Sequence, residues 1–199
     1  ATYMRGLDFG FISTTLLGQV DASIGGKNGV NVADYKNMVG TIVHPRFVIS
    51  DVEMLRTLSE RELRAGMAEV VKSAIIGDAE LFDYIERWAA DTLYHSSEQM
   101  QNIVLRAVRV KAAIVEADER ERGLRRLLNL GHTIGHAIEK STRAVNHGEA
   151  VAMGLVAIAK AAAKEGMLPE RDAERIASVV STLGLSIEPP VPVTAIMRA

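Results

Sequence analysis

The chain has 199 residues and a mass of 21.6 kDa, enough for one ordinary domain or for one domain with part of another. Hydrophobic residues make up 48% and charged residues 24%, a balance that excludes an intrinsically disordered chain. The formal net charge of −2 argues against a nucleic-acid-binding protein. The absence of cysteine excludes a disulfide scaffold, a thiolate metal site and a cysteine nucleophile, and it agrees with the cytoplasmic location that we expect.

The N-terminus lacks the basic start and apolar stretch of a targeting signal. The most apolar segment, residues 150–163, carries Lys160 and is shorter than the ~20 residues that a membrane span requires. We therefore expect a soluble protein without a membrane partner. The sequence begins without an initiator methionine and stops without a capping or stop signal, so we expect both ends to be cuts in a longer sequence.

Residues 1–58 have the pattern of an α/β fragment. Two short β-branched or aromatic runs, residues 9–16 and 46–50, predict buried strands. The glycine-rich segment 25–29 between them predicts an irregular loop that allows close backbone approach.

From residue 59 onward the pattern is helical. Ser59 and Glu62 have capping-box spacing, and apolar residues follow at helical intervals. Further helices are predicted over residues 80–89, 98–117, 131–140, 148–166 and 169–184. The proline-rich residues 189–192 predict an extended linker. The expected fold class is mainly α, with a helical domain at 59–199 preceded by a short α/β fragment at 1–58 that holds two or more strands.

Three histidines have the spacing of a metal site. His132 and His136 are four residues apart, on one face of a predicted helix. This resembles the zincin H-E-x-x-H spacing, but Thr133 stands where that motif has its general-base glutamate, so the zincin reading fails. A helical hairpin would bring His147 back beside His132.

Glu69 is the best carboxylate donor for such a site. It lies in a largely apolar stretch, where an unpaired carboxylate would be costly. With His132 and His147 it would form a three-ligand site with open positions, which is typical of catalytic zinc. The alternative for each histidine is a capped or hydrogen-bonded core residue. That alternative suits one isolated histidine, whereas His132, His136 and His147 together with Glu69 favour a metal.

Several polar side chains lie where helix or strand formation does not need them: Lys27, Lys36, Asn37, Lys72, Lys111, Arg125 and Asn129. Lys72 follows Glu69 by three residues and shares its helix face, and we expect Arg125, Asn129 and His132 to share another. Any one of these cations alone is better explained as a solvated surface charge. Together with a metal, they predict a site for a small phosphorylated acid.

The segment Gly26-Lys27-Asn28 is not a phosphate-binding Walker A loop. That motif needs a glycine where Asp21 stands and a serine or threonine where Asn28 stands. A mononucleotide kinase is therefore disfavoured.

Motifs from residue 3 to about residue 155 resemble those of the 3-dehydroquinate synthases, in the order of that family. They are Tyr3-Met4-Arg5-Gly6, Thr14-Thr15-Leu16-Leu17, Asp21-Ala22-Ser23-Ile24-Gly25-Gly26-Lys27, Lys36-Asn37-Met38-Val39-Gly40, Arg61-Glu62-Leu63, Ala68-Glu69-Val70-Val71-Lys72, residues 128–139 and His147-Gly148-Glu149-Ala150-Val151. The resemblance implies an NAD-dependent phosphorus–oxygen lyase of the shikimate pathway, which leads to the aromatic amino acids. Such enzymes convert 3-deoxy-D-arabino-heptulosonate 7-phosphate to 3-dehydroquinate and phosphate by oxidation, phosphate elimination, reduction and aldol closure at a zinc or cobalt ion.

The resemblance also implies residue roles. The metal ligands of the family correspond to Glu69, His132 and His147, the same three residues that the spacing predicts. Its substrate-binding and catalytic positions correspond to Lys27, Asn37, Lys72, Lys111, Arg125, Asn129, His136, Glu121 and Arg5. Lys72, Asn37, Asn129 and His136 would hold the phosphate, Lys111 and Arg125 the carboxylate, and Arg5 would serve a neighbouring subunit of a homodimer. The NAD contacts correspond to Thr14, Thr15, Asp21, Lys27, Lys36, Met54, Leu55, Arg56 and Thr57, which makes residues 1–58 a remnant of the nucleotide-binding domain.

The sequence also departs from the family. A glycine-rich dinucleotide segment before residue 1 and an Asp-Lys-Lys motif near the C-terminus are missing. Ser13, Asn28, Tyr35 and Ser73 replace a usual proline, threonine, glycine and tyrosine, and none of them is a ligand. We expect this chain alone to hold a metal, but to bind NAD poorly and to turn over little substrate.

Three alternatives compete with this interpretation. A sister sugar-phosphate cyclase, such as 2-deoxy-scyllo-inosose synthase, acts on a substrate without a carboxylate, so Lys111 and Arg125 favour dehydroquinate synthase. A metal-dependent polyol dehydrogenase of the glycerol type would not need Lys72 and Asn129. A helical interaction module that has lost catalysis is disfavoured because all three ligands and the cations are retained.

Overall fold

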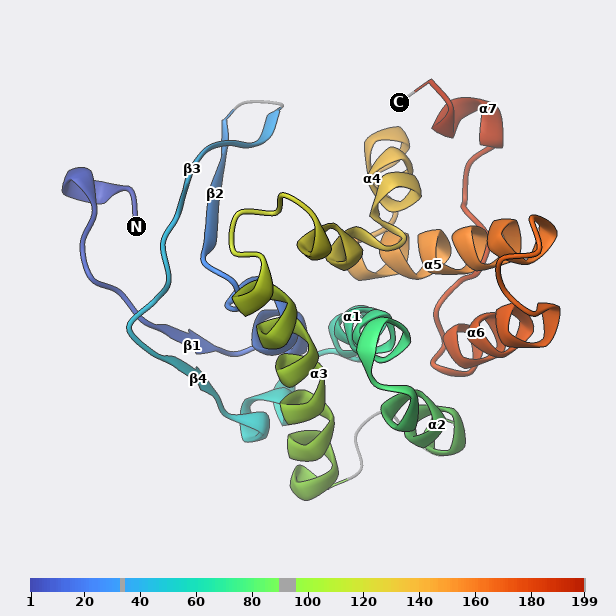
Figure 1. The fold of residues 1–199 in the computed structure, drawn as a ribbon, viewed down its shortest axis with the longest axis horizontal. Helices are drawn as coiled ribbons and strands as arrows, with labels where there is room; N and C mark the ends of the chain where they lie inside the picture. Colours follow the sequence, from blue (N-terminus) through green and yellow to red (C-terminus); the bar gives the residue numbers. More distant parts are fainter. Residues whose placement is uncertain (33–34, 90–95, 199) are drawn as a thin grey trace.

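The computed structural model describes residues 1–32, 35–89 and 96–198, except for the side chains of residues 31 and 35–37. In chain order the elements are η1 (Tyr3–Arg5), β1 (Phe11–Ser13), η2 (Gly18–Ala22), β2 (Lys27–Val32), β3 (Tyr35–Ile42), β4 (Val48–Ser50), η3 (Val52–Thr57), α1 (Glu60–Gly77), α2 (Ala79–Trp88), α3 (Ser97–Ala117), η4 (Leu124–Asn129), α4 (His132–Ser141), α5 (His147–Lys164), α6 (Glu170–Thr182) and α7 (Val193–Ile196). The strands gather at one end of the molecule and the helices form the rest, as Figure 1 shows. The expected fold class, mainly α with a short α/β fragment in front, is confirmed.

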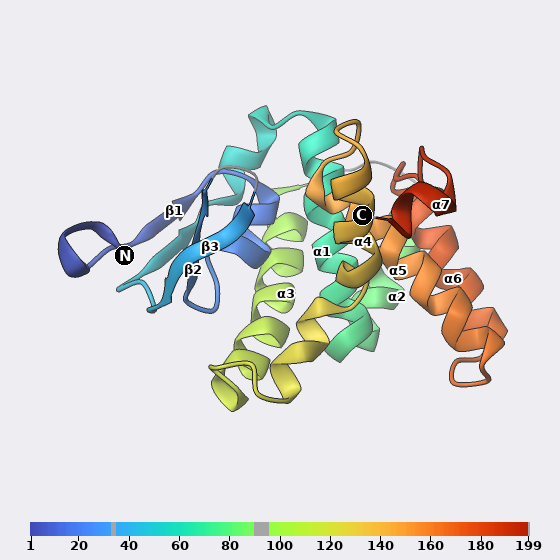
Figure 2. The same cartoon turned by 90° about the horizontal axis from the view of Figure 1, so that it is seen from above.

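Helix α1 is the centre of the helical body. It packs against α2, α3 and α5, which surround it in Figures 1 and 2. From Ala65 to Ala74 every residue is buried, and all of them except Glu69, Lys72 and Ser73 are small or apolar. The two charged side chains are therefore held in the main hydrophobic core.

The helix boundaries follow the capping residues that the sequence provides. Ser59 precedes α1, and its hydroxyl accepts a hydrogen bond from the Glu62 amide. Asn146 and Glu149 form a complete capping box at the start of α5. Gly166, two residues beyond the end of α5, has a φ of +71°. The predicted helices are confirmed, with boundaries that differ from the expected ones by one or two residues.

Helices α4 and α5 form an antiparallel hairpin that sets the position of the histidines. A Cβ atom added at Gly154 on α5 would lie 2.0 Å from the carbonyl oxygen of Gly131, just before α4. Gly131 itself has a φ of +77°, a conformation that favours glycine. These two glycines allow the backbones to approach closely enough for His132 and His147 to face each other.

The strands differ from the prediction. β1 covers only Phe11–Ser13 and not residues 9–16, because Leu16 enters a helical turn and packs into the core. β1 pairs in parallel with β4, placing Ile12 opposite Ile49. The expectation of buried strands was wrong, since Ile12 is 62% and Ile49 is 48% exposed. Within the described chain, this sheet has two strands.

The glycine-rich segment 25–29 was expected to form an irregular loop. Instead, β2 begins at Lys27 and pairs in antiparallel fashion with β3, which contains residues 36–37. Gly29 lies opposite Gly40, where an added Cβ would be 2.3 Å from the Asn28 carbonyl oxygen. These glycines therefore permit close strand pairing and not an irregular loop.

Two points remain, the membrane-spanning potential of the helices and the domain boundary. Among the described residues, no helix is both long and apolar enough to cross a membrane. The division of the chain at residues 58 and 59 stays a prediction.

Candidate metal centre and anion site

Helices α1, α4 and α5 bring Glu69, His132 and His147 together. The Nε2 atoms of His132 and His147 lie 3.6 Å and 3.5 Å from Oε1 of Glu69. The ligand atoms of the three residues all lie within 4.8 Å of one another. The Glu69 side chain is 1% exposed, whereas the imidazoles are 12% and 31% exposed, so the group opens toward the histidine side.

This geometry fits a zinc or cobalt ion. Zinc–ligand bonds of 2.0–2.1 Å in a tetrahedral site put the ligand atoms about 3.3 Å apart, close to the two distances here. Neither oxygen of Glu69 makes a hydrogen bond of good geometry with the described residues. Because buried carboxylate oxygens without hydrogen bonds are costly, a cation beside them would be stabilising.

Each imidazole is oriented by a partner on its other ring nitrogen. The Nδ1 atom of His132 lies 3.2 Å from the Leu130 carbonyl oxygen, and Nδ1 of His147 lies 3.5 Å from Oε2 of Glu139. When each ring is neutral and its Nδ1 proton is directed to that oxygen, the Nε2 lone pair faces Glu69, as metal-binding histidines require. His132 and His147 are thus arranged as ligands and not as core residues.

The local charges also suit a metal. Burial opposes ionisation of Glu69, but the Lys72 ammonium and the two imidazoles outweigh it and lower its pKa to about 2. Burial, together with the charge of Lys72, lowers the pKa of His132, which favours the neutral ring that a metal requires. The nearby carboxylates of Glu139 and Glu69 raise the pKa of His147 to about 9, so this residue must lose a proton when a metal binds.

His136 lies beside the three candidate ligands, on the exposed side. Its ring centroid is 5.3 Å from that of His132 and 6.1 Å from that of His147. His136, Glu139 and His147 form a second group whose ligand atoms lie within 4.8 Å of one another. His136 is therefore placed where a molecule bound to the metal would reach it.

A chain of contacts joins the three candidate metal ligands to the predicted cations. Lys72 forms an ion pair with Glu69, and its Nζ lies 4.0 Å from Oδ1 of Asp21. The Lys111 ammonium donates to Oδ1 of Asp21 at 2.5 Å and to its carbonyl oxygen at 2.7 Å. Burial lowers the pKa of Lys111, opposed by the carboxylate of Asp21. The structure thus places Lys72, Asp21 and Lys111, from three different elements, in one continuous network.

A second network joins the strands to the helices through Glu121. Its carboxylate forms an ion pair with Lys27 on β2 and accepts a hydrogen bond of 2.7 Å from the Asn129 amide. Glu121 has a φ of +57°, which is uncommon outside glycine. The Asp118 carboxylate holds this turn by accepting the Gly123 amide proton at 2.7 Å. The strained residue therefore has a fixed position between Lys27 and Asn129.

The prediction that Arg125 shares a helix face with Asn129 and His132 was wrong. Arg125 belongs to the 3-10 helix η4, which Leu130 and Gly131 separate from α4. Its guanidinium is buried and donates to the carbonyl oxygens of Gly25 at 2.6 Å and of Glu119 at 2.5 Å. Arg125 thus holds the glycine segment against the helical body.

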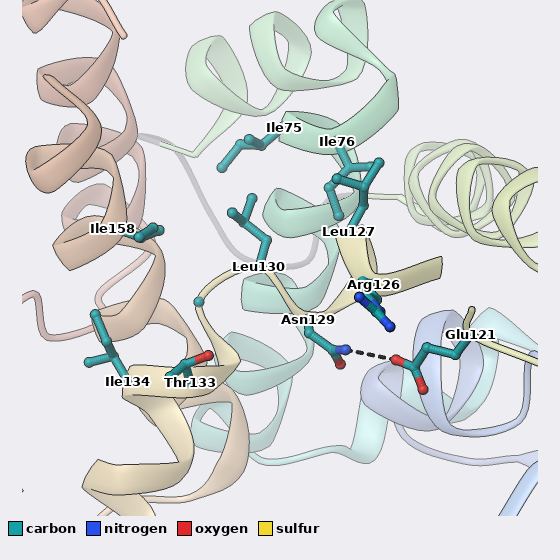
Figure 3. A pocket seen from close by; sticks show the side chains of 11 residues that line it. Ile75, Ile76, Glu121, Arg126, Leu127, Asn129, Leu130, Thr133, Ile134 and Ile158 are labelled. Atoms are coloured by element: carbon teal, nitrogen blue, oxygen red, sulfur yellow. Dashed lines mark hydrogen bonds between the residues drawn. The ribbon is translucent and has the colours of Figure 1, made fainter. Parts of the chain in front are cut away.

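Two cavities flank these networks. One, of about 1120 Å³, lies between the strands and the helices and is lined in part by Asp21, Lys27, Lys111 and Arg125. The other, of about 810 Å³, is shown in Figure 3, where Asn129 bonds to Glu121 beside a largely apolar wall. That wall contains Ile75, Ile76, Leu127, Leu130, Ile134 and Ile158. The first cavity has the cations that an acidic ligand would need.

The residues predicted to contact NAD lie in two separate regions of the structure. Asp21 and Lys27 line the larger cavity, whereas Thr14 and Thr15 follow β1 and residues 54–57 belong to η3, after β4. Because β1 and β4 are parallel, these last two segments leave the same edge of the sheet. The side chain of Leu55 is 1% exposed in the core, which leaves only its backbone for a ligand. The side chains of Lys36 and Asn37 lie outside the described part of the structure.

The described residues do not form a complete dinucleotide pocket. Such a pocket requires an open parallel sheet with helices on both faces. The described chain supplies one parallel pair, β1 and β4, and the segments at its carboxyl edge. Arg5 is exposed at the end of η1, and this N-terminal segment lies on the far side of the strands from α4 (Figures 1 and 2).

The interpretation of the sequence gave no role to several residues around the candidate ligands. Glu139 follows His136 by three residues on the same helix, so helical periodicity could have identified it. Arg61 and Glu149 form an ion pair between α1 and α5, which no local pattern reveals.

Comparisons with known proteins agree with this arrangement. A family described as 3-dehydroquinate synthase N-terminal matches residues 1–65, and one described as 3-dehydroquinate synthase C-terminal matches residues 66–199. The chain belongs to the 3-dehydroquinate synthase family. A 3-dehydroquinate synthase of Desulforamulus reducens is 46% identical over 192 residues, which cover 96% of this chain and 54% of that protein. A 3-dehydroquinate synthase of Rippkaea orientalis is 47% identical over 191 residues, or 93% of this chain and 52% of the relative.

The chain therefore spans about half the length of the 3-dehydroquinate synthases that it matches. Solved structures of related cyclases have the same fold. A 2-epi-5-epi-valiolone synthase from Streptomyces hygroscopicus, with NAD+ and Zn2+ bound, has a TM-score of 0.90 and 33% identity over 99% of this chain and 56% of its own. A 2-deoxy-scyllo-inosose synthase complexed with carbaglucose-6-phosphate, NAD+ and Co2+ also has a TM-score of 0.90, with 28% identity over 99% of this chain and 55% of its own.

Proposed function

We propose that this chain is the metal- and substrate-binding part of a 3-dehydroquinate synthase, which converts 3-deoxy-D-arabino-heptulosonate 7-phosphate to 3-dehydroquinate and phosphate. The observation that supports this most strongly is the unbroken line of contacts from Glu69 through Lys72 and Asp21 to Lys111. It joins a candidate metal site to a cavity lined by cations. The substrate has both a phosphate and a carboxylate, and both need such cations.

Glu69, His132 and His147 would hold the metal, which, when bound, supplies a Lewis acid that polarises an alcohol oxygen of the substrate. Lys72, His136 and Asn129 would bind the phosphate, with Asn37 as the fourth member of the set that the family resemblance implies. Lys111 would bind the carboxylate. Two donors of the Arg125 guanidinium are already bonded to backbone carbonyls, so we assign Arg125 a share in the carboxylate site through its remaining N–H groups.

Glu121 would keep Lys27 and Asn129 in place for this chemistry. Its carboxylate contacts both side chains, one from the strands and one from the helical body. Burial opposes the ionisation of Glu121, but the hydrogen bonds from Lys27 and Asn129 prevail and lower its pKa. The residue is thus an anion that orients two donors.

The oxidation and reduction in the family's reaction need NAD, and we derive no step through it because the described residues do not complete its pocket. Thr14, Thr15 and residues 54–57 would contribute one edge of that pocket, and Asp21, Lys27 and Lys36 another part. Homodimerisation, with Arg5 serving the partner subunit, and a cytoplasmic location stay predictions.

The sister cyclases are the main alternative, and ligand preference separates the two. We would titrate the zinc-loaded chain by calorimetry with heptulosonate 7-phosphate and, separately, with glucose 6-phosphate, which lacks a carboxylate. The heptulosonate phosphate should bind about tenfold more tightly or better, because a charged hydrogen bond to its carboxylate is worth about 1.5–3 kcal/mol. Lys111→Met should remove most of this preference, whereas Lys164→Met, on the exposed last turn of α5, should leave it unchanged.

Equal or tighter binding of glucose 6-phosphate would contradict the proposal and favour a sister cyclase. Binding of neither phosphate, despite one equivalent of zinc, would favour a helical module without catalysis. Release of inorganic phosphate with and without NAD, measured on the same samples, would report whether this chain turns over substrate at all.

A further inference from the structure

His147 is the first residue of α5, so its position depends on how the start of this helix lies on α1. Gly148 is buried there, and a Cβ atom added to it would lie 2.1 Å from the Ala65 carbonyl oxygen. Ala65 is one helical turn before Glu69. The close approach of the two backbones is therefore what brings Nε2 of His147 to 3.5 Å from Glu69.

An ion pair between Arg61 and Glu149 joins α1 to the start of α5 at the same place. The Arg61 guanidinium, on the first turn of α1, donates from Nε and Nη2 to the two carboxylate oxygens of Glu149, both at 2.8 Å. Nη2 also donates to the Ala144 carbonyl oxygen at 2.8 Å, in the loop that leads into α5. A bidentate arginine–carboxylate pair is among the stronger and more directional contacts in proteins.

Glu149 also makes hydrogen bonds within the first turn of α5, so the ion pair with Arg61 restrains the backbone of that turn. Its Oε2 accepts the Asn146 amide proton at 2.8 Å, and its own amide donates to Oδ1 of Asn146 at 3.0 Å. We call Arg61, Asn146 and Glu149 the α5 bracket. An ordinary exposed ion pair would join two side chains only, whereas this one also fixes the backbone on both sides of His147.

We propose that Arg61 and Glu149 are positioning residues, which hold His147 at coordinating distance from Glu69. The inference rests on the metal site of the proposed function. Without the bracket, the ligands remain but the first turn of α5 is free to move away from α1. Loss of groups that orient metal ligands commonly lowers metal affinity about 10- to 100-fold, and we expect an effect of this size.

The matched control is Arg175, which joins two helices in the same way but contacts none of the candidate ligands. Its guanidinium donates from Nε and Nη2 to the two carboxylate oxygens of Glu86, at 2.9 and 2.6 Å, between α6 and α2. The Arg175 side chain is 41% exposed and that of Arg61 is 56% exposed, so the two arginines are similarly solvated.

The experiment compares Arg61→Ala, Arg61→Lys and Arg175→Ala with the parent chain. Zinc affinity would be measured by competition with a chromophoric chelator, and hydrogen exchange of the Glu149 and Ala150 amides would be measured without metal. Arg61→Ala should lower zinc affinity about 10- to 100-fold and speed exchange at both amides. Arg61→Lys should recover only part of the affinity, because lysine lacks the bidentate fork. Arg175→Ala should change neither quantity.

Three outcomes distinguish a failure of the inference from a failure of the metal site. If Arg61→Ala binds zinc as tightly as Arg175→Ala does, the inference is overturned and the metal site stands. If the parent chain binds no zinc, the proposed metal site fails, and the exchange rates alone decide whether the bracket holds α5. Unchanged exchange at Glu149 and Ala150 would overturn the bracket in either case.

Discussion

At the scale of single residues, the pair Glu69 and Lys72 determines the character of the site. Both side chains are almost fully buried, at 1% and 3% exposure. Burying two charges is costly unless each has a partner, and such pairs are often replaceable by apolar residues without loss of stability. Their presence in an otherwise apolar helix therefore indicates a functional requirement. Lys72 keeps the Glu69 carboxylate ionised and ready for a cation.

Replacing Lys72 tests this interpretation. Lys72→Met should destabilise the metal-free chain by about 3 kcal/mol or more, because it leaves the charge of Glu69 buried without its partner. Zinc should restore part of the loss by supplying a new positive charge. Urea unfolding with and without zinc would measure both effects. Lys160→Met, at an exposed position on α5, should change the free energy of unfolding by less than about 0.5 kcal/mol. Equal stability of the two variants would contradict the account.

Residue spacing could predict the candidate ligands but not all of their partners. His132, His136 and His147 follow from helical periodicity and a hairpin, and Glu69 from its apolar neighbours. The contacts of Asp21 with Lys111 and of Lys27 with Glu121 join residues 90 and 94 positions apart. Such contacts depend on how whole elements pack, which no local pattern encodes. The same reason explains why the placement of Arg125 was wrong.

At the scale of elements, the long helices were predictable, whereas the strands were predictable only in part: β1 and β4 lie within the predicted runs, but β2 and β3 were not expected. Caps such as Ser59 and Asn146 and long apolar periodicities define helices from local sequence alone. The strands have three to eight residues, and their pairing depends on distant partners. Gly29 belonged to the predicted loop because glycine disfavours strands on average, yet here it faces Gly40 across the sheet.

Asp78 links two helices, and its charge leads us to predict a pH-dependent contribution to stability. It caps α2 by accepting the Leu81 amide proton at 3.0 Å and forms an ion pair with Arg106 on α3. The hydrogen bond from Arg106, opposed by burial, lowers the pKa of Asp78. A carboxylate with a lowered folded-state pKa contributes stability above its unfolded pKa of about 3.9, and this contribution is lost as the pH falls through the folded value.

Asp78→Asn should therefore be less stable than the parent by about 1 kcal/mol at pH 7, since the amide retains a cap but loses the ion pair. The difference should shrink as the pH falls below about 4, where the parent also loses the charge. Urea unfolding of the metal-free proteins at several pH values would measure this. A difference that stays constant down to pH 2 would show that the charge of Asp78 contributes nothing.

At the scale of the whole molecule, the helical body encloses one large hydrophobic core with smaller clusters beside it, whereas the strands expose apolar side chains. Ile12 and Ile49 face solvent on the parallel pair, and Met38 and Val39 do so on the antiparallel pair. Parallel sheets are normally covered on both faces. The chain also spans only about half the length of its relatives. The exposed strands therefore mark the surface on which we expect further protein to pack.

Isolated chains should associate through these strands. Apolar strand faces and unpaired edges promote self-association, so sedimentation equilibrium should show an average mass that rises with concentration. The double variant Ile12→Lys/Ile49→Glu, which places opposite charges at paired positions, should reduce association several-fold. Leu105→Lys, at a partly exposed apolar position on α3, should not. Equal association of the two variants would exclude the parallel pair as the contact surface.

The metal content of the purified chain tests the central claim most directly. We would measure zinc and cobalt in the parent and in Glu69→Ala, His132→Ala and His147→Ala, each after reconstitution and removal of loosely bound ions. The account predicts about one equivalent in the parent and a large loss in every variant, because three protein ligands hold a catalytic zinc ion. A parent chain without bound metal, or variants that retain it, would contradict the assignment of Glu69, His132 and His147 as the metal site.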